Sequence, residues 1–348
     1  MTILGIETSC DETSVAVVRN GREVLSNVIA SQVELHAPFG GVVPEIAARR
    51  HIECIGSITD EALRQAEVSF ADIDAYAVAN GPGLAGALLV GLNYAKALAY
   101  VNKKPLVGVQ HIEGHVCANF LEGGLEPVCA GESKSKVSAS PPFLSLVVSG
   151  GHTLLLAVTD YDTYKVIGST RDDAAGEAFD KVARVLGLPY PGGPEIDRVA
   201  ANGSPDAVAF PRAKVRGYDF SFSGLKTAVV QHVAKLKQAD GTCSLQGLIP
   251  DIAASFQQAV VDVLVERATT ACKNENFSHV ALAGGVACNK GLRAAMETAC
   301  REKGIGLSIP KPVYCTDNAA MIASRGYYRL AAGHEDDLAL NAFPGRMV

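Results

Sequence analysis

The chain has 348 residues, which favours two domains of about 150 residues each over a single hydrophobic core. Hydrophobic residues make up 48% of it, charged residues 20%, and the net charge is −6, so the balance is globular and lacks the basic footprint usual for nucleic-acid binding. We find no signal-peptide pattern, no apolar run of roughly 18 residues and no C-x-x-C pair among nine scattered cysteines. A cytoplasmic protein without membrane contact or a disulfide framework is therefore expected.

The first 31 residues are predicted to form three strands. Apolar runs at 3–9 and 14–18 flank the turn CDET, and a third run at 24–31 follows the turn NGRE. Asp11 and Glu12 lie in the first turn. A phosphate-handling fold would place a catalytic or metal-orienting carboxylate there.

A strand, a Gly-rich turn and a helix are predicted over 75–100. The turn GPGLAG resembles G-x-G-x-x-G, but no acidic residue in a following strand supports a dinucleotide site. Farther on, His111 and His115 are spaced to share one face of a helix and could chelate a metal, with Asp317 as a candidate third ligand. The acid of HIEGH sits one position too late for H-E-x-x-H. Two solvated or hydrogen-bonded histidines fit this spacing equally well.

The second half of the chain repeats the plan of the first. Residues 122–142, rich in Gly, Ser, Pro and Lys, are predicted to be a flexible linker or insertion. Strands predicted at 144–149, 154–159 and 164–170 match the first three strands. Residues 278–300 are predicted to form a strand, a Gly-rich turn and a helix, as are residues 75–100. We therefore expect halves at 1–121 and 143–330, a helical insertion at about 197–250, a helix at 251–274 and a weakly ordered tail within 331–348.

Two Gly-rich turns follow apolar strands at mirrored positions, at 149–152 and 283–286. Exposed backbone amides in such turns can bind phosphate, although either turn alone is more often an ordinary tight turn. Neither matches a P-loop.

Acidic residues follow the first of these turns. The segment RDDAAGEAFDK is predicted to begin a helix with acids in its first turn. Helix capping and the helix dipole account for most of these acids, but less well for Asp180, which lies deeper in the helix. Asp197 could accept hydrogen bonds from a ribose diol, but we favour an ordinary acid at a helix N-terminus.

Nine motifs occur together and in order, over roughly 1–330. They are GIETSCDET (5–13), GGVVPEIAARRH (40–51), GPGLAGALLVG (81–91), HIEGH (111–115), VSGGHT (148–153), DDAAGEAFDKVARVLGLPYPGGP (172–194), FSFSGLKTA (220–228), GGVACNKGLR (284–293) and CTDNAAMIA (315–323). With these motifs the chain resembles the bacterial tRNA adenosine threonylcarbamoyltransferases.

The resemblance implies an α/β fold of the duplicated actin-like and sugar-kinase type, with two RNase H-like domains and a cleft between them. It implies transfer of threonylcarbamoyl from threonylcarbamoyl-AMP to N6 of the adenosine 3′ of the anticodon, in tRNAs that read codons beginning with A. The implied metal ligands are His111, His115 and Asp317, for one Fe2+ or Zn2+. Asp11 and Glu12 would lie near the reacting group. The implied adenylate site, in which ATP or ADP could also bind, comprises Val147, Val148, Ser149, Gly150, Gly151, Asp180, Gly193, Asp197 and Asn289.

The resemblance also implies partners: tRNA, an inert paralogous subunit of the same fold, a small P-loop ATPase, and a separate enzyme that makes the adenylate. Two departures stand out. The insertion at about 128–140 is longer than usual, and Val147 occupies the position of a metal-ligating tyrosine in archaeal relatives.

Three alternative functions remain: a small-molecule kinase of the same fold, a metalloprotease, and a non-catalytic scaffold, which would lack HIEGH and CTDN.

Overall fold

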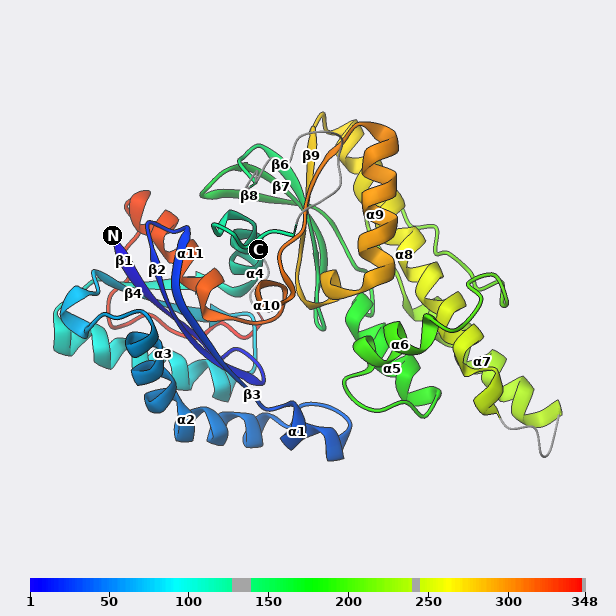
Figure 1. Ribbon diagram of the computed structural model, residues 1–348, viewed down its shortest axis with the longest axis horizontal. Helices are drawn as coiled ribbons and strands as arrows, with labels where there is room; N and C mark the ends of the chain where they lie inside the picture. The colour runs from blue at the N-terminus through cyan, green and yellow to red at the C-terminus, as the bar shows by residue number, and fades with distance from the viewer. Residues whose placement is uncertain (127–138, 240–244, 346–348) are drawn as a thin grey trace.

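Two five-stranded sheets, one in each lobe, organise the computed structural model of the chain (Figure 1). It describes residues 1–126, 139–239 and 245–345. Most of the insertion predicted at 122–142 lies outside the described residues.

The first sheet has the order β3-β2-β1-β4-β5. Strands β1 to β3 pair antiparallel, and β4 and β5 continue from β1 as parallel strands. The strands are β1 (Thr2–Glu7), β2 (Glu12–Arg19), β3 (Glu23–Ser31), β4 (Ala75–Gly81) and β5 (Leu106–Gln110).

The second sheet repeats this pattern strand for strand, in the order β8-β7-β6-β9-β10. Strands β6 to β8 pair antiparallel, and β9 and β10 add in parallel. They are β6 (Phe143–Val148), β7 (Thr153–Asp160), β8 (Thr163–Ser169), β9 (His279–Ala283) and β10 (Gly306–Ser308). The identical order and orientation confirm the predicted duplication and its strands.

Helices cover both sheets. The first lobe has α1 (Val33–His36), η1 (Ala37–Phe39), α2 (Pro44–Gln65), η2 (Phe70–Asp72) and α3 (Ala85–Asn102). The second has α5 (Ala175–Val185), α6 (Gly192–Ala200), α7 (Ser223–Ala239), η4 (Leu245–Gly247), α8 (Ile249–Asn274), η5 (Gly285–Cys288) and α9 (Lys290–Lys303). The helix predicted at 251–274 is confirmed in α8, and α7 lies within the segment where extra residues were expected.

The chain leaves the first lobe through α4 (His111–Cys117) and η3 (Ala118–Phe120), and it returns between α10 (Pro312–Cys315) and α11 (Ala319–Ala331) (Figure 1). Although α11 ends the predicted second half, it packs against β1, β2 and β4 of the first sheet. Gly5 permits this contact, because a Cβ there would lie 2.4 Å from the carbonyl oxygen of Ala319. The α11 helix thus brings a C-terminal segment back to the first lobe.

The tail differs from its prediction. Asp336 bridges to Leu106 and accepts a hydrogen bond from Gly108 N, and Phe343 N donates to Asn80 O. Residues 336–343 therefore pack along β4 and β5, whereas the sequence suggested a weakly ordered tail, because these long-range pairings cannot be seen in the sequence. Residues 346–348 lie outside the described residues.

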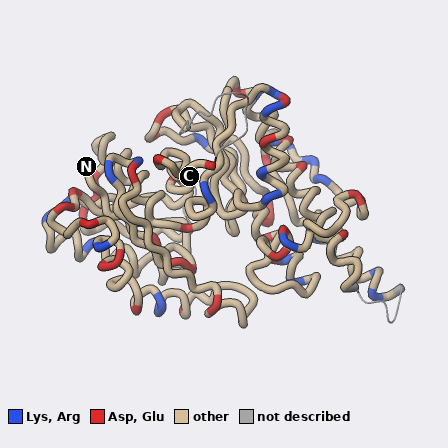
Figure 2. Tube along the Cα trace, viewed as in Figure 1, with Lys and Arg blue, Asp and Glu red and all other residues tan. Residues whose placement is uncertain are grey.

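Charge is spread over both lobes, with Lys and Arg interspersed among Asp and Glu (Figure 2). The seven described cysteines are free thiols. Within the described ranges, the helices are all too short or too polar to cross a membrane.

Candidate metal and nucleotide site

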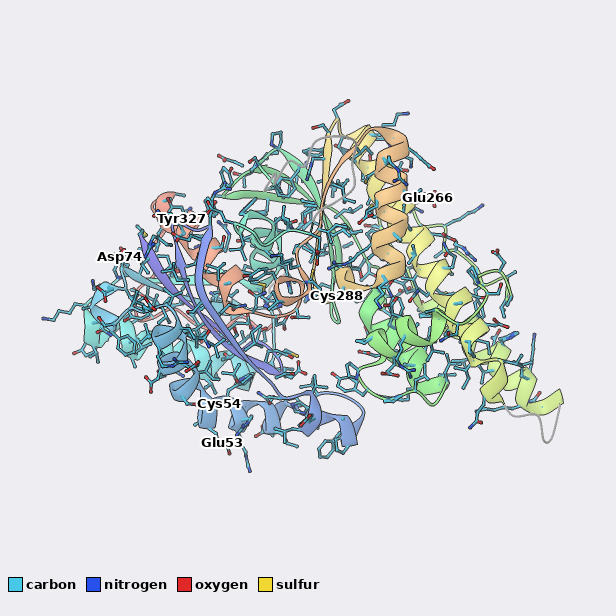
Figure 3. The ribbon with its side chains drawn as sticks, in the orientation of Figure 1. Glu53, Cys54, Asp74, Glu266, Cys288 and Tyr327 are labelled. Atoms are coloured by element: carbon cyan, nitrogen blue, oxygen red, sulfur yellow. The ribbon has the colours of Figure 1, made fainter. Side chains whose placement is uncertain are left out.

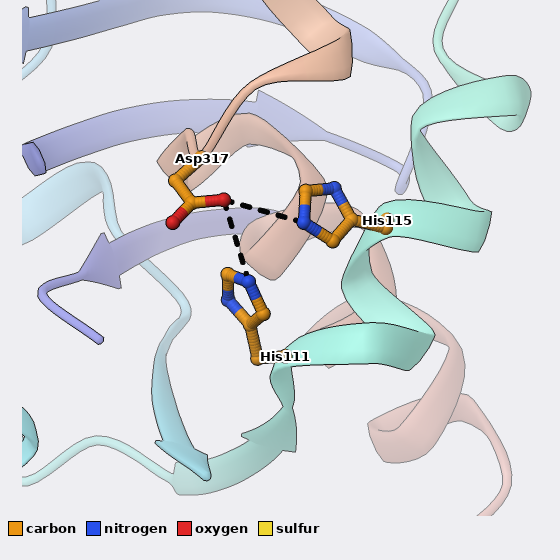
Figure 4. A group of neighbouring side chains, drawn as sticks. All are labelled: His111, His115 and Asp317. Carbon is orange, nitrogen blue, oxygen red and sulfur yellow. Dashed lines mark ion pairs between the residues drawn. The ribbon is translucent and has the colours of Figure 1, made fainter. Parts of the chain in front are cut away.

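His111, His115 and Asp317 converge between the lobes (Figure 4). The histidines project from one face of α4, and Asp317 comes from the loop before α11. Asp317 Oδ1 lies 3.4 Å from His111 Nε2 and 3.3 Å from His115 Nε2. Among the described residues, this is the one group of three ligating side chains close enough to hold a metal ion.

The side chains fit a metal. Both ring nitrogens of His115 are fully buried without a hydrogen-bond partner among the described residues, and its contact with Asp317 lacks hydrogen-bond alignment. Burial, outweighing Asp317, lowers the pKa of His115, which favours the neutral imidazole that ligates metals. Burial alone would raise the pKa of Asp317, but the two histidines hold it well below its ordinary value, which favours the anionic carboxylate that a metal ion would need.

Glu7 is the site residue that the sequence reasoning missed. It is fully buried at the end of β1, and its Oε2 lies 2.9 Å from His111 Nδ1. A carboxylate that accepts a hydrogen bond from Nδ1–H leaves Nε2 free to face Asp317 and fixes the orientation of the ring. The available signal was the Glu of GIETS at a strand end, two residues before a turn.

Asp11, in the first turn, and Glu12, which begins β2 rather than lying in the turn as predicted, are close to Asp317. Asp11 is 9% exposed, and its carbonyl accepts a hydrogen bond from Gln32 N. Burial, followed by the charges of Asp11 and Asp317, raises the pKa of Glu12 to about 9. The turn and the start of β2 therefore place a pair of interacting carboxylates beside the triad.

Both Gly-rich turns meet at one end of the second sheet. Ser149 N donates to His152 O and closes the first turn. Gly284 has φ +87°, and a Cβ there would come within 2.4 Å of Val148 O. Burial, followed by the nearby His111 and His115, lowers the pKa of His152 to about 4. The first turn is therefore adjacent to the histidines as well as to the second turn.

Five more of the predicted adenylate residues lie in or beside these turns. Val147 and Val148 are buried at the end of β6, and Gly150 and Gly151 have open space where a Cβ would stand. Asn289 caps α9 by accepting a hydrogen bond from Leu292 N.

Helices α5 and α6 hold the other three of these residues. Asp180 accepts a hydrogen bond from Gly192 N, and burial raises its pKa. Gly193 and Asp197 share one face of α6. Because Asp197 lies beyond the first turn of α6, our preferred interpretation of it as a helix N-terminal acid was wrong.

Of the acids of RDDAAGEAFDK, Glu177 lies in the first turn of α5 as expected, but Asp172 and Asp173 precede the helix, which begins only at Ala175. Asp172 instead accepts hydrogen bonds from Ser221 and Ser223, and Asp173 pairs with Lys181 and Lys226. These acids anchor the FSFSGLK segment, whose position the sequence did not reveal.

A cavity of about 320 Å³ adjoins Asp180. Segment 37–40 of the first lobe and residues 180–192 of the second line it, and the Arg184 guanidinium donates a hydrogen bond to Gly40 O. The lobes therefore also meet at this cavity.

Two similar sheets with Gly-rich turns facing an interlobe site define an α/β protein of the actin-like ATPase fold. Solved structures agree at the level of the fold. HypF from T. kodakarensis superposes with a TM-score of 0.62 at 13% identity, over 95% of this chain and 48% of that one. Component A of (R)-2-hydroxyglutaryl-CoA dehydratase from Acidaminococcus fermentans gives 0.51 at 16% identity, over 95% and 99%.

Sequence comparison narrows this class to one family. The model of the TsaD family, tRNA N6-adenosine threonylcarbamoyltransferase, matches residues 23–324. Proteins named tRNA N6-adenosine threonylcarbamoyltransferase are 52% identical in Clostridium novyi (strain NT), over 98% of this chain and 96% of the relative, and in Caldicellulosiruptor saccharolyticus, over 99% and 97%. The chain belongs to the tRNA N6-adenosine threonylcarbamoyltransferase family.

Proposed function

We propose that this chain transfers the threonylcarbamoyl group from threonylcarbamoyl-AMP to N6 of the adenosine 3′ of the anticodon, in tRNAs that read codons beginning with A. Family membership supports the reaction. The observation that carries its assignment to this site is the convergence of His111, His115 and Asp317 beside the first Gly-rich turn.

In the proposed reaction, the N6 amine attacks the carbamoyl carbonyl carbon. The bond from that carbon to the phosphate oxygen breaks, AMP leaves, and the amine proton passes to a carboxylate, for which Asp11 is our candidate. Glu12, beside it, keeps a second carboxyl group at the reacting position.

The second lobe would hold the donor. The backbone amides of Ser149, Gly150 and Gly151 can stabilise the phosphate charge as AMP departs. Asp180, Gly193, Asp197 and Asn289, with the strand end at Val147 and Val148, would hold the adenosine part, and ATP or ADP could occupy the same place.

His111, His115 and Asp317 would hold Fe2+ or Zn2+, between which this ligand set does not discriminate. When bound, the metal supplies Lewis-acid polarisation and an anchor for donor oxygens. Glu7 keeps His111 oriented for this role.

The rival metalloprotease interpretation gains no support from HIEGH, because the acid of that motif is bound by Arg325 on another face of α4. We further propose that the chain works in the cytoplasm with an inert paralogous subunit and a P-loop ATPase, while a separate synthase supplies the adenylate. Its net charge of −6 supports a need for such partners in binding tRNA.

Reconstitution tests the function. The chain, those partner subunits, threonylcarbamoyl-AMP and an unmodified tRNA transcript are mixed, and the digested nucleosides are analysed by mass spectrometry. Asp11→Asn should bind the adenylate normally but lower the transfer rate by about 10²–10⁴-fold. Asp74→Asn, a matched change at the far end of the first lobe (Figure 3), should transfer normally.

Wild-type protein without product, beside partners shown to be competent with another transferase, would refute the proposed reaction. Normal transfer by Asp11→Asn would refute only its role as proton acceptor.

A further inference from the structure

Glu113, the acid of HIEGH, does not belong to the metal triad. On a helix it lies about 200° around the axis from His111 and about as far from His115. It therefore points away from Asp317, and its backbone N is held by the Gln110 side chain, which caps α4. The family motif gives a reason for the histidines but none for this acid.

The partner of Glu113 is Arg325 on α11. Arg325 Nε donates to Glu113 Oε2 at 2.7 Å, and Nη1 donates to Asp162 Oδ1 at 2.6 Å. The guanidinium also stacks over the Tyr164 ring, 4.8 Å from its centroid. Only 4% of the Arg325 side chain is exposed, so one buried cation binds two carboxylates and an aromatic face.

These contacts join three parts of the molecule. Glu113 is on α4 with both histidines, Arg325 is on the helix that follows Asp317, and Asp162 is in the β7–β8 turn of the second lobe. Gly114 completes the contact between the two helices, because a Cβ there would lie 2.9 Å from Ile322 Cδ1. The planar fork of Arg325 thus sets the spacing and rotation of α4 relative to α11.

We propose that Arg325 is a positioning residue for metal binding: by clamping Glu113 and Asp162 it fixes α4 so that His111 and His115 face Asp317. The inference rests on the metal site of the proposed function. Arg325 contacts Glu113, Asp162 and Tyr164 rather than the three candidate ligands, so its effect must pass through helix orientation.

Metal-free protein titrated with Co2+ tests this directly, since the visible absorption of Co2+ reports coordination geometry. Arg325→Met, which keeps the aliphatic bulk, should weaken Co2+ binding by about 10–100-fold and alter the spectrum. Arg267→Met is the control, because Arg267 likewise anchors a loop, through Val215 O and Gly217 O, but lies in the second lobe on α8. It should leave affinity and spectrum unchanged.

Two variants at Glu113 provide an independent test in case Arg325→Met does not fold. Glu113→Gln keeps an oxygen acceptor for Arg325 Nε and should bind Co2+ nearly as wild type, whereas Glu113→Ala should lose affinity. Wild-type affinity and spectrum in both Arg325→Met and Glu113→Ala would overturn the inference. Failure of the wild type itself to bind Co2+ would instead overturn the metal site on which the inference depends.

Discussion

Gly176 gives the sharpest test of how the first Gly-rich turn is held. It is the second residue of α5, and a Cβ there would lie 2.5 Å from Ser149 O and 2.8 Å from Gly150 Cα. Ordinary contacts begin at 3.4 Å, so the backbone of the turn or helix must move by about 0.9 Å. Gly224 is the second residue of α7, and beyond its own helix backbone and chain neighbours no atom lies within 4 Å of such a Cβ.

We expect Gly176→Ala to destabilise the protein and Gly224→Ala to stabilise it slightly. Alanine in place of helical glycine gains up to about 1 kcal/mol. Overpacking costs about 1–3 kcal/mol, and only Gly176→Ala incurs it. Because the propensity gain is common to both variants, the difference between them should be about 1–3 kcal/mol.

Urea unfolding of both variants measures that difference, and titration with AMP measures its effect on the turn. Gly176→Ala should also bind AMP more weakly, because Gly176 N donates to Ser149 O within the candidate site. Equal free energies of unfolding for the two variants, or a higher one for Gly176→Ala, would refute the reasoning. They would show that the turn can move away from the added Cβ at no cost in stability.

Three further outcomes are expected. Asp317→Ala should abolish the rise in melting temperature that Co2+ produces in the wild type, as read by differential scanning fluorimetry; an undiminished rise would place the metal elsewhere. Asp172→Ala should cost about 2–3 kcal/mol in urea unfolding, since it removes the acceptor of the Ser221 and Ser223 hydroxyls, and a loss below 0.5 kcal/mol would contradict this anchoring. Burial lowers the pKa of His279, so the unfolded state binds more protons, and stability should fall as pH drops through about 6.5. His279→Gln should lose less stability than wild type between pH 7.5 and 5.5, and equal losses would exclude His279 as a source.

Much of the fold followed from local pattern. Alternating and continuous apolar runs predicted the strands of both sheets, and their repetition predicted the duplication. The packing of α11 on the first sheet was not predictable in this way. It depends on a close contact with Gly5, which is more than 300 residues away in the sequence. The packed tail escaped prediction for the same reason, since Asp336 pairs with Leu106 through backbone atoms.

The site divided along similar lines. The spacing of His111 and His115 gave two candidate ligands from helix geometry alone, but Asp317 gained support only from the family motif. Glu7 and Arg325 were missed because neither residue type nor spacing marks a partner 104 or 212 residues away. The role of each becomes visible only in the folded chain, where Glu7 lies against His111 and Arg325 lies against Glu113.

Helix α4 explains why candidate metal ligands and packing residues are interleaved in a single short motif. His111 and His115 face Asp317, while Ile112 and Val116 belong to the core shared with the second sheet. Glu113 and Gly114 face α11, where they meet Arg325 and Ile322. Each side of α4 therefore has a neighbour. Since α4 sits between the lobes, a shift of one lobe against the other must either move the histidines relative to Asp317 or repack α4. The geometry of the candidate metal site is therefore coupled to the arrangement of the lobes, and variants at the lobe contacts should change Co2+ coordination without touching a ligand.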